Sequence, residues 1–227
     1  ANFSVPFVRW YERGNVDWDY AIFTVTGITP EQLRSENFPP KNMVHSINVD
    51  GKPICIILKR ETKDDFIGYQ QMKAQEYDSA IVSLTRALKV DPLNESIYVN
   101  LSESYYRKEQ IAMAKPYIDK LLKFAPTYES GSYMLGIYYL SSVLPDEALK
   151  VYRNLININS KYSAAYHIGF LAYAQKQNIR GAEKVLNAMV DAEAVNDQGI
   201  KDLLILYLNQ GLDEYGAYKK LYKTLYQ

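Results

Sequence analysis

The feature that most constrains the fold of this chain is a small residue that returns every 34 residues, at Ala80, Ala114, Ala148, Ala182 and Gly216. A fixed period of this length indicates a solenoid in which each repeat is a pair of helices. Repeats that stack on copies of themselves need the same small and bulky positions each time, and we interpret the small residue as the point of closest helix contact. The sequence therefore predicts a mainly α-helical array of helix pairs.

Other types of residue recur with the same period at fixed distances from this small residue. In the second helix of each pair, an apolar residue follows four positions later, at Leu84, Ile118, Tyr152 and Leu186, and another follows seven positions later, at Ala87, Leu121, Leu155 and Met189. The first helices share an aromatic column, at Tyr105, Tyr139, Tyr173 and Tyr207. This spacing places the apolar residues on one helix face, which we expect to form the core of the array.

These columns resemble the tetratricopeptide repeat family, whose pattern is W-x2-L-G-x2-Y, then A-x3-F, then P. The resemblance covers residues 61–227, with Pro92 and Pro126 closing the first two units and with the first Trp absent. It implies a right-handed superhelical solenoid with units at 61–94, 95–128, 129–162, 163–196 and 197–227. By the same register, Ser96 is expected to be exposed. The lysines of the last unit, Lys219, Lys220 and Lys223, are interpreted as a solvated capping face.

Residues 1–60 do not follow the repeat and predict a small α+β cap. Thr29, Pro30 and Gln32 indicate a short helix with Thr29 as its N-cap. Within 43–58, two runs rich in β-branched residues flank Asp50 and Gly51, which is a strong hairpin signal. Because two strands alone are only marginally stable, we expect the hairpin to pack on the aromatic segment before it or on the first repeat after it.

The N-terminal segment carries a second resemblance. Residues 18–23, 38–41 and 49–53, followed by the repeats, look like the soluble tail of certain bacterial polytopic, glycosyltransferase-like membrane proteins. This resemblance implies that the chain is the C-terminal domain of a longer protein, attached covalently to an N-terminal transmembrane region. It also implies an extracytoplasmic location, on the periplasmic face of a bacterial membrane, and a cytoplasmic location is the alternative.

Composition and motifs limit the classes of function. The 26 basic and 26 acidic side chains balance, so no net field attracts nucleic acid or an anionic bilayer. A single cysteine, Cys55, excludes an internal disulfide, and His45 and His167 lack the companions of a zinc motif. The sequence has no phosphate-binding loop and no nucleophile motif. We therefore predict no enzyme, no cofactor, no metal site and no nucleic-acid partner.

Function is expected instead on the concave groove that first helices of such repeats form. The family spacing places positions five, nine, twelve and thirteen of each unit in this groove. The predicted groove residues are Tyr69, Met72 and Lys73, then Val99, Glu103, Tyr106 and Arg107, then Tyr133, Ile137 and Leu140, and finally His167 and Leu171. Asp65 and Tyr69 stand where chaperone-binding members of the family have lysine and asparagine, so a carboxylate clamp is not expected.

The leading hypothesis is a protein-interaction scaffold that holds an extended or helical segment of a protein partner, or of its own parent protein. Its expected anchors are Tyr69, Tyr106, Arg107, Tyr133 and Ile137, since tyrosine and arginine are enriched at binding hot spots. Two alternatives stay open. The chain is an accessory domain of a membrane glycosyltransferase-like protein, or it is a structural spacer whose groove is filled by residues 1–42, because exposed apolar grooves are uncommon.

Overall fold

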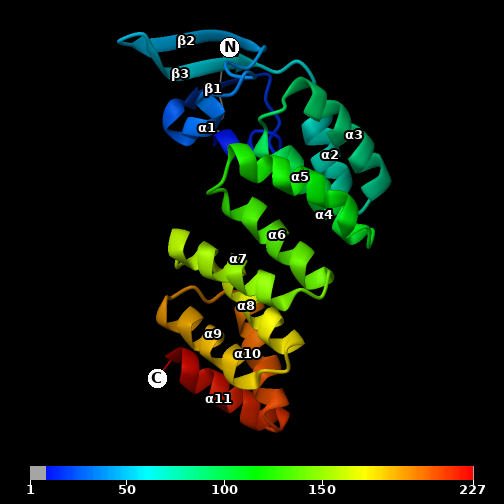
Figure 1. The fold of residues 1–227 in the computed structure, drawn as a ribbon, viewed down its shortest axis with the longest axis vertical. Coiled ribbons are helices and arrows are strands. Elements are labelled where there is room, and N and C mark those ends of the chain that lie inside the picture. Colours follow the sequence, from blue (N-terminus) through cyan, green and yellow to red (C-terminus); the bar gives the residue numbers. More distant parts are fainter. Residues whose placement is uncertain (1–8, 227) are drawn as a thin grey trace, which may run out of the picture. The chain divides into compact units, whose positions relative to one another are not determined.

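The computed structural model describes residues 9–226, which form a small α+β segment followed by five helix pairs (Figure 1). The pairs are α2 (Asp64–Lys73) with α3 (Tyr77–Val90), α4 (Glu95–Arg107) with α5 (Ile111–Phe124), α6 (Glu129–Ser141) with α7 (Pro145–Ile158), α8 (Ser163–Gln175) with α9 (Ile179–Asp191), and α10 (Asp197–Asn209) with α11 (Glu214–Tyr226). The predicted mainly α-helical fold of helix pairs with a small N-terminal α+β segment is confirmed.

The chain divides into two compact units, Ala1–Gly131 and Ser132–Gln227. The first unit contains the α+β segment together with the first two helix pairs, so the predicted domain boundary at residue 60 lies inside it and stays a prediction. Residues 1–8, which the predicted cap includes, and Gln227 lie outside the described residues. Each unit is described by itself.

The α+β segment contains a three-stranded antiparallel sheet with the order β1-β3-β2. Its strands are β1 (Tyr20–Thr24), β2 (Met43–Val49) and β3 (Lys52–Lys59), and the 3-10 turns η1 (Trp10–Glu12) and η2 (Val25–Gly27) flank β1. Asp50 and Gly51, between β2 and β3, have φ values of 49° and 73°, which a two-residue hairpin turn requires. The hairpin is thus found where the sequence predicts it, and β1 is a strand that the sequence analysis missed.

The inner face of the sheet forms the core of the α+β segment. Ala21 and Phe23 of β1 pair with Leu58 and Ile56 of β3, and all four side chains are buried. The ring of Trp10 meets that of Phe23 edge to face, with 5.4 Å between centroids. The hairpin therefore packs on the aromatic segment before it, which is one of the two expected supports.

Helix α1 (Pro30–Leu33) begins with the predicted cap. The Thr29 hydroxyl accepts the backbone N–H of Gln32 at 3.2 Å, and the Gln32 side chain accepts the backbone N–H of Thr29 at 2.8 Å. This reciprocal pair satisfies two backbone donors that the first turn of a helix leaves without a partner. The prediction of Thr29 as N-cap is confirmed.

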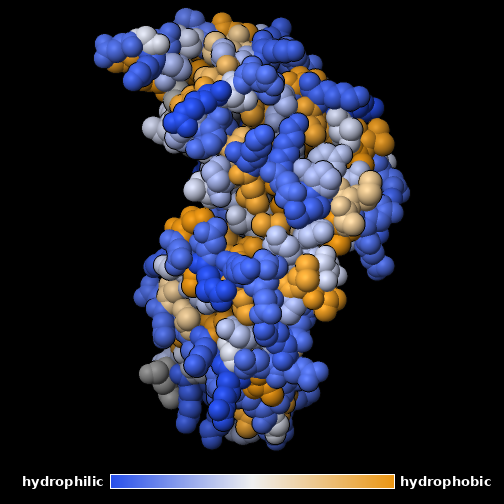
Figure 2. All heavy atoms as spheres, viewed as in Figure 1, coloured by the Kyte–Doolittle hydropathy of each residue, from blue (hydrophilic) through white to orange (hydrophobic). Residues whose placement is uncertain are grey.

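Close helix contact at small residues holds the pairs together in both units. Ala80, Ala114 and Ala148 are 0% exposed. A Cβ atom added to Gly68 of α2 would come within 2.6 Å of the Leu84 side chain on α3, so only glycine allows these two helices to approach as they do. The outer surface visible in Figure 2 is mostly hydrophilic, because the apolar stripes face inward.

The register of the last helix pair differs from the prediction. The connection between α10 and α11, residues 210–213, is one residue longer than the connection between α8 and α9, residues 176–178. Ala217 and Leu221 are therefore the buried residues of α11, at 1% and 8% exposure. The atoms nearest to a Cβ atom added at Gly216 belong to Asp213 and Leu212, which precede its own helix. The prediction of Gly216 as the fifth small contact residue is wrong, and Ala217 takes that place.

Replacement of Ala114 by leucine tests the helix contact. Ala114 is fully buried at the contact of α4 and α5, so Ala114→Leu should overpack the pair and lower the free energy of unfolding by about 1 to 3 kcal/mol in urea melts. Ala112 lies exposed on the same helix, and Ala112→Leu should change the free energy of unfolding by less than about 0.5 kcal/mol. Equal effects of the two changes would mean that the contact register is misassigned.

Candidate functional site

The first unit contains a hollow of about 410 Å³ between α2 and α4, which we call the α2–α4 groove. Its lining residues are Met72, Lys73, Gln75, Tyr77, Val99, Asn100, Glu103 and Arg107. Five of the predicted groove residues meet here, namely Met72, Lys73, Val99, Glu103 and Arg107. The structure thus brings together the predicted residues of the first and second repeats, except Tyr69 and Tyr106, which are half-buried and do not line the hollow.

Helix periodicity explains why these side chains converge. Val99, Glu103 and Arg107 follow one another at intervals of four on α4, so they lie on one face of the helix. The Arg107 Nε donates a hydrogen bond to Glu103 Oε1 at 2.7 Å, and this bond raises the pKa of the Arg107 guanidinium. Lys73 is exposed and forms no ion pair with the residues that the structure describes. The groove therefore combines apolar side chains, one internal ion pair and an exposed lysine.

The N-terminal segment covers the start of α4. The backbone N–H of Gly14 donates to Ser96 Oγ at 3.1 Å, and Asn100 Nδ2 donates to Asn15 Oδ1 at 2.8 Å. Ser96 is only 1% exposed, so the prediction that it is exposed is wrong. Asn100 also lines the α2–α4 groove, so the N-terminal segment holds one lining residue of the groove without lining it itself.

Arg13 fixes this segment in place. Its side chain is fully buried and forms a bidentate pair with Asp91, at 2.8 and 3.0 Å, and a third bond to Glu95 Oε2 at 3.0 Å. Gln32 donates to the other oxygen of Glu95. Burial raises the pKa of Glu95, and the charge of Arg13 opposes that rise by favouring the carboxylate. A single arginine therefore joins the α+β segment to the connection between α3 and α4.

Asp65, at the position of the first clamp lysine, is occupied within the fold. Arg60 Nη2 contacts its Oδ1 at 2.7 Å, and Asp65 is 7% exposed. Burial raises the pKa of Asp65, and Arg60 opposes this rise. Asp65 therefore contributes to packing of the α+β segment against α2 and presents no charge to the groove.

In the second unit, the predicted residues have separate roles. Tyr133 is half-buried on α6, whereas Ile137 and Leu140 are 7% and 6% exposed and are packing residues. The expectation that Ile137 anchors a partner therefore does not fit its burial. His167 Nδ1 lies 2.8 Å from Oδ2 of the buried Asp202, which leaves that ring nitrogen engaged.

The second unit also holds groove positions that the sequence analysis missed. Leu171 is half-buried, and Ile205, 34 residues later in the same column, is 46% exposed on α10. Leu208 is 44% exposed one turn further on. Continuing the groove columns by one more period would have identified both residues. They give the second unit an exposed apolar strip at the register of the predicted groove.

A second hollow in the first unit has about 480 Å³ and lies between η2, α1 and the residues that join α5 to α6. Its lining includes Tyr11, Thr29, Glu95 and Tyr128, none of which the sequence predicts as a site. The Glu95 carboxylate in its wall is already bonded to Arg13 and Gln32. We therefore place the candidate site at the α2–α4 groove, where five predicted residues converge.

Among residues 9–226, no helix combines the length and apolar character needed to cross a membrane. The predicted attachment to an N-terminal transmembrane region and the predicted periplasmic location stay predictions.

Residues 95–128 match a family model described as Tetratricopeptide repeat. These residues contain α4 and α5. Small glutamine-rich tetratricopeptide repeat-containing protein 2 of Saccharomyces cerevisiae is 23% identical over 135 residues. The aligned part is 60% of this chain and 37% of the yeast protein, so the chain spans little more than a third of that relative.

Two solved structures share the fold. TTC0263, a thermophilic TPR protein of Thermus thermophilus, is 22% identical with a TM-score of 0.59, over 70% of this chain and 86% of that one. MamA is 21% identical with a TM-score of 0.55, over 70% of this chain and 92% of that one. Both identities are below 25%, so these likenesses establish the fold alone.

Removal of the Arg13 charge tests the attachment of the N-terminal segment. Arg13→Gln leaves two acidic groups without their cation, and it should lower the free energy of unfolding by about 3 to 5 kcal/mol. Arg86→Gln removes the exposed ion pair with Asp64 and should lower the free energy of unfolding by less than about 1 kcal/mol. Urea melts measure both values, and a similar small loss in both variants would contradict the role assigned to Arg13.

Proposed function

Because the chain is a tetratricopeptide repeat protein, we propose that it is a non-catalytic interaction module that holds a segment of a protein partner in the α2–α4 groove. Tetratricopeptide repeat proteins generally mediate protein–protein interactions. The observation that carries the proposal is the meeting of five predicted groove residues around one hollow of about 410 Å³.

The size and lining of the groove suit an apolar side chain of a partner. Its volume lies in the range of about 300 to 1,000 Å³ that ligand pockets occupy. Met72 and Val99 line it from α2 and α4 respectively. Methionine adapts its shape to different partners, and apolar area removed from water contributes about 25 cal/mol per Å². An inserted aliphatic or aromatic residue would thus supply most of the affinity.

The charges in the groove favour an acidic neighbour for that residue. Glu103 already neutralises Arg107, so Lys73 is the cation with no ion-pair partner among the described residues. A carboxylate on the partner segment would compensate Lys73 at the groove rim. The proposed ligand is therefore a peptide segment with an apolar residue close to an Asp or Glu.

The lining side chains suit binding and not covalent chemistry. A nucleophilic mechanism needs a Ser, Thr or Cys beside an oriented base. The groove lining instead consists of apolar, amide and charged side chains, with the Tyr77 phenol as its hydroxyl. This composition supports a holding function.

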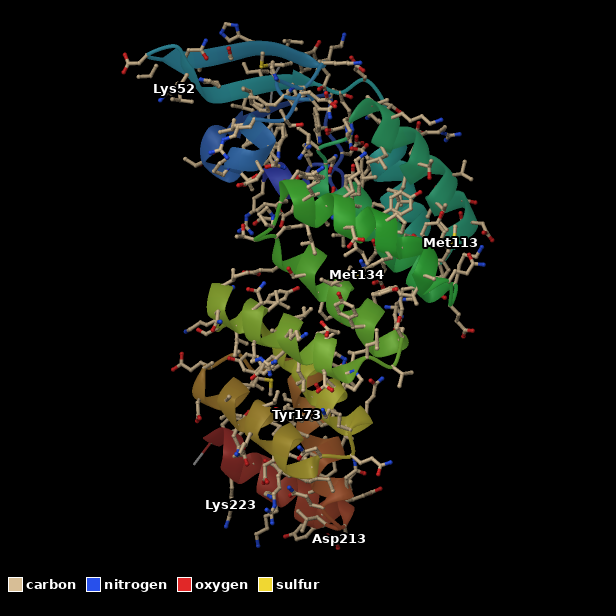
Figure 3. The ribbon with its side chains drawn as sticks, viewed as in Figure 1. Lys52, Met113, Met134, Tyr173, Asp213 and Lys223 are labelled. Carbon is tan, nitrogen blue, oxygen red and sulfur yellow. The ribbon has the colours of Figure 1, made fainter. Side chains whose placement is uncertain are left out.

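Replacement of one methionine in the groove tests the proposal. Peptides that bind the immobilised protein are selected from a random phage-displayed library, and their Kd values are measured by fluorescence polarisation. Met72→Glu replaces an apolar lining side chain with a charged one, so it should weaken binding of the selected peptides by about tenfold or more. Met113, which is 57% exposed on α5 and labelled in Figure 3, does not line the groove, so Met113→Glu should leave binding unchanged.

Equal binding by both methionine variants would place the peptide site elsewhere. Met72 is half-buried and packs against the core of the first repeat, whereas Met113 is exposed, so thermal melts followed by circular dichroism set a temperature for the binding measurements at which both variants are folded. A Lys73→Gln variant should selectively weaken the peptides that carry Asp or Glu, and its effect should shrink as salt concentration rises.

A further inference from the structure

Four tyrosines form an exposed row on one face of α11, which we call the tyrosine ridge. They are Tyr215, Tyr218, Tyr222 and Tyr226, with exposed fractions of 76%, 60%, 60% and 72%. Their spacing of three, four and four residues places them on one face of the helix. The rings of Tyr222 and Tyr226 lie 5.2 Å apart between centroids, so the last two rings of the row are in contact.

Packing of the repeat does not require these tyrosines. The buried residues Ala217 and Leu221 of α11 correspond to Ala182 and Leu186 of α9, which are also buried. Counted from these pairs, the tyrosine ridge corresponds to Arg180, Glu183, Asn187 and Asp191 on α9. The preceding repeat thus has polar and charged side chains where α11 has tyrosine. The tyrosines at these positions are therefore specific to α11 compared with α9, and packing between the repeats does not explain them.

Two lysines border the tyrosine ridge without a counter-charge. Lys219 and Lys223 are exposed and form no ion pair with residues 9–226, and Lys223 is labelled on α11 in Figure 3. Lys220 differs, because its ammonium lies 4.5 Å from the Tyr207 ring centroid and 2.8 Å from the Gln210 side chain. Glu214, at the start of the helix, is the acidic residue within α11. The ridge is therefore aromatic and locally cationic, although the whole chain has no net charge.

We propose that the tyrosine ridge of α11 binds the surface of an anionic lipid bilayer. A tyrosine side chain has an apolar ring and a polar hydroxyl, and it is enriched at the boundary between hydrocarbon and water for that reason. Lysines beside such rings reach lipid phosphates, and each one near an anionic surface strengthens binding severalfold. A helix that has aromatic and basic side chains along one side lies in the plane of the membrane–water interface.

The shape of the ridge distinguishes a bilayer from an acidic peptide. A bound peptide gains affinity by filling a hollow, as in the α2–α4 groove, whereas the tyrosines project from a single helix and are more than half exposed. A deformable lipid interface accepts projecting rings along the whole row at once. The inference is independent of the proposed peptide groove, because the two surfaces share no residue.

Vesicle sedimentation tests the inference with the full chain. Vesicles of phosphatidylcholine alone are compared with vesicles of equal amounts of phosphatidylcholine and phosphatidylglycerol. The wild-type chain should sediment with the anionic vesicles and remain in solution with the neutral ones. Lys219→Gln with Lys223→Gln should reduce binding about tenfold. Tyr218→Gln with Tyr222→Gln should reduce it at least as much, since glutamine keeps the helix but removes the rings.

A matched control uses a tyrosine outside the ridge. Tyr20 is 51% exposed on β1, and Tyr20→Gln should leave vesicle binding unchanged. Circular dichroism melts should coincide for all variants, because the replaced side chains are exposed. Failure of the wild-type chain to sediment with anionic vesicles overturns the proposal. Equal binding by the tyrosine variants and the wild-type chain also overturns it.

Three further outcomes would overturn the proposal of a bilayer and identify a different binding partner of the tyrosine ridge. In each of them, the wild-type chain does not bind vesicles but shows another kind of association, and Tyr218→Gln with Tyr222→Gln abolishes that association. Self-association in sedimentation velocity identifies a second copy of this chain. Binding of oligo-glutamate identifies an acidic protein segment. Binding of oligo-uridine identifies single-stranded nucleic acid, whose bases stack on aromatic rings.

Discussion

Close approach of two helices at one small residue is the constraint on which this structure depends. With Ala80 and Ala114 fully buried, each pair brings its backbones together, and the neighbouring leucines fill the remaining space. The Gly68–Leu84 contact shows how little room is left, since a single added methyl group would collide with Leu84. Because close-packed interiors tolerate such additions poorly, the same small residue has to return in every repeat, and this gives the sequence its period.

The same stacking leaves the first helices with a face that their own pair does not cover, and this produces the candidate site. α2 and α4 present Met72 and Val99 to a hollow that the N-terminal segment does not fill. Arg13, Gly14 and Asn15 attach to the start of α4, through Glu95, Ser96 and Asn100. The α+β segment thus covers the start of α4 and leaves the α2–α4 groove to be lined by residues of the helix pairs.

The two proposed surfaces differ in the physics that would supply affinity. The α2–α4 groove offers a concave volume in which Met72 and Val99 lie beside polar and charged side chains and an exposed lysine, which suits an inserted side chain and a neighbouring carboxylate. The tyrosine ridge on α11 offers projecting amphipathic rings beside exposed lysines, which suits a planar anionic interface. Each surface belongs to a different compact unit, and each can be altered without touching the core that stabilises the other.

The sequence by itself determined the helix pairs, the hairpin at Asp50–Gly51 and the Thr29 cap, because period, turn chemistry and capping act between residues close in the chain. It also indicated five of the side chains that meet in the α2–α4 groove. Only the tertiary structure decided that β1 joins the hairpin, that Ser96 is covered and that Ala217 replaces Gly216. The first two depend on contacts between distant segments, namely the pairing of β1 with β3 and the bond from Gly14 to Ser96, and the third depends on a connection one residue longer. A local pattern contains neither the partner of a long-range ion pair nor the burial that a distant segment imposes.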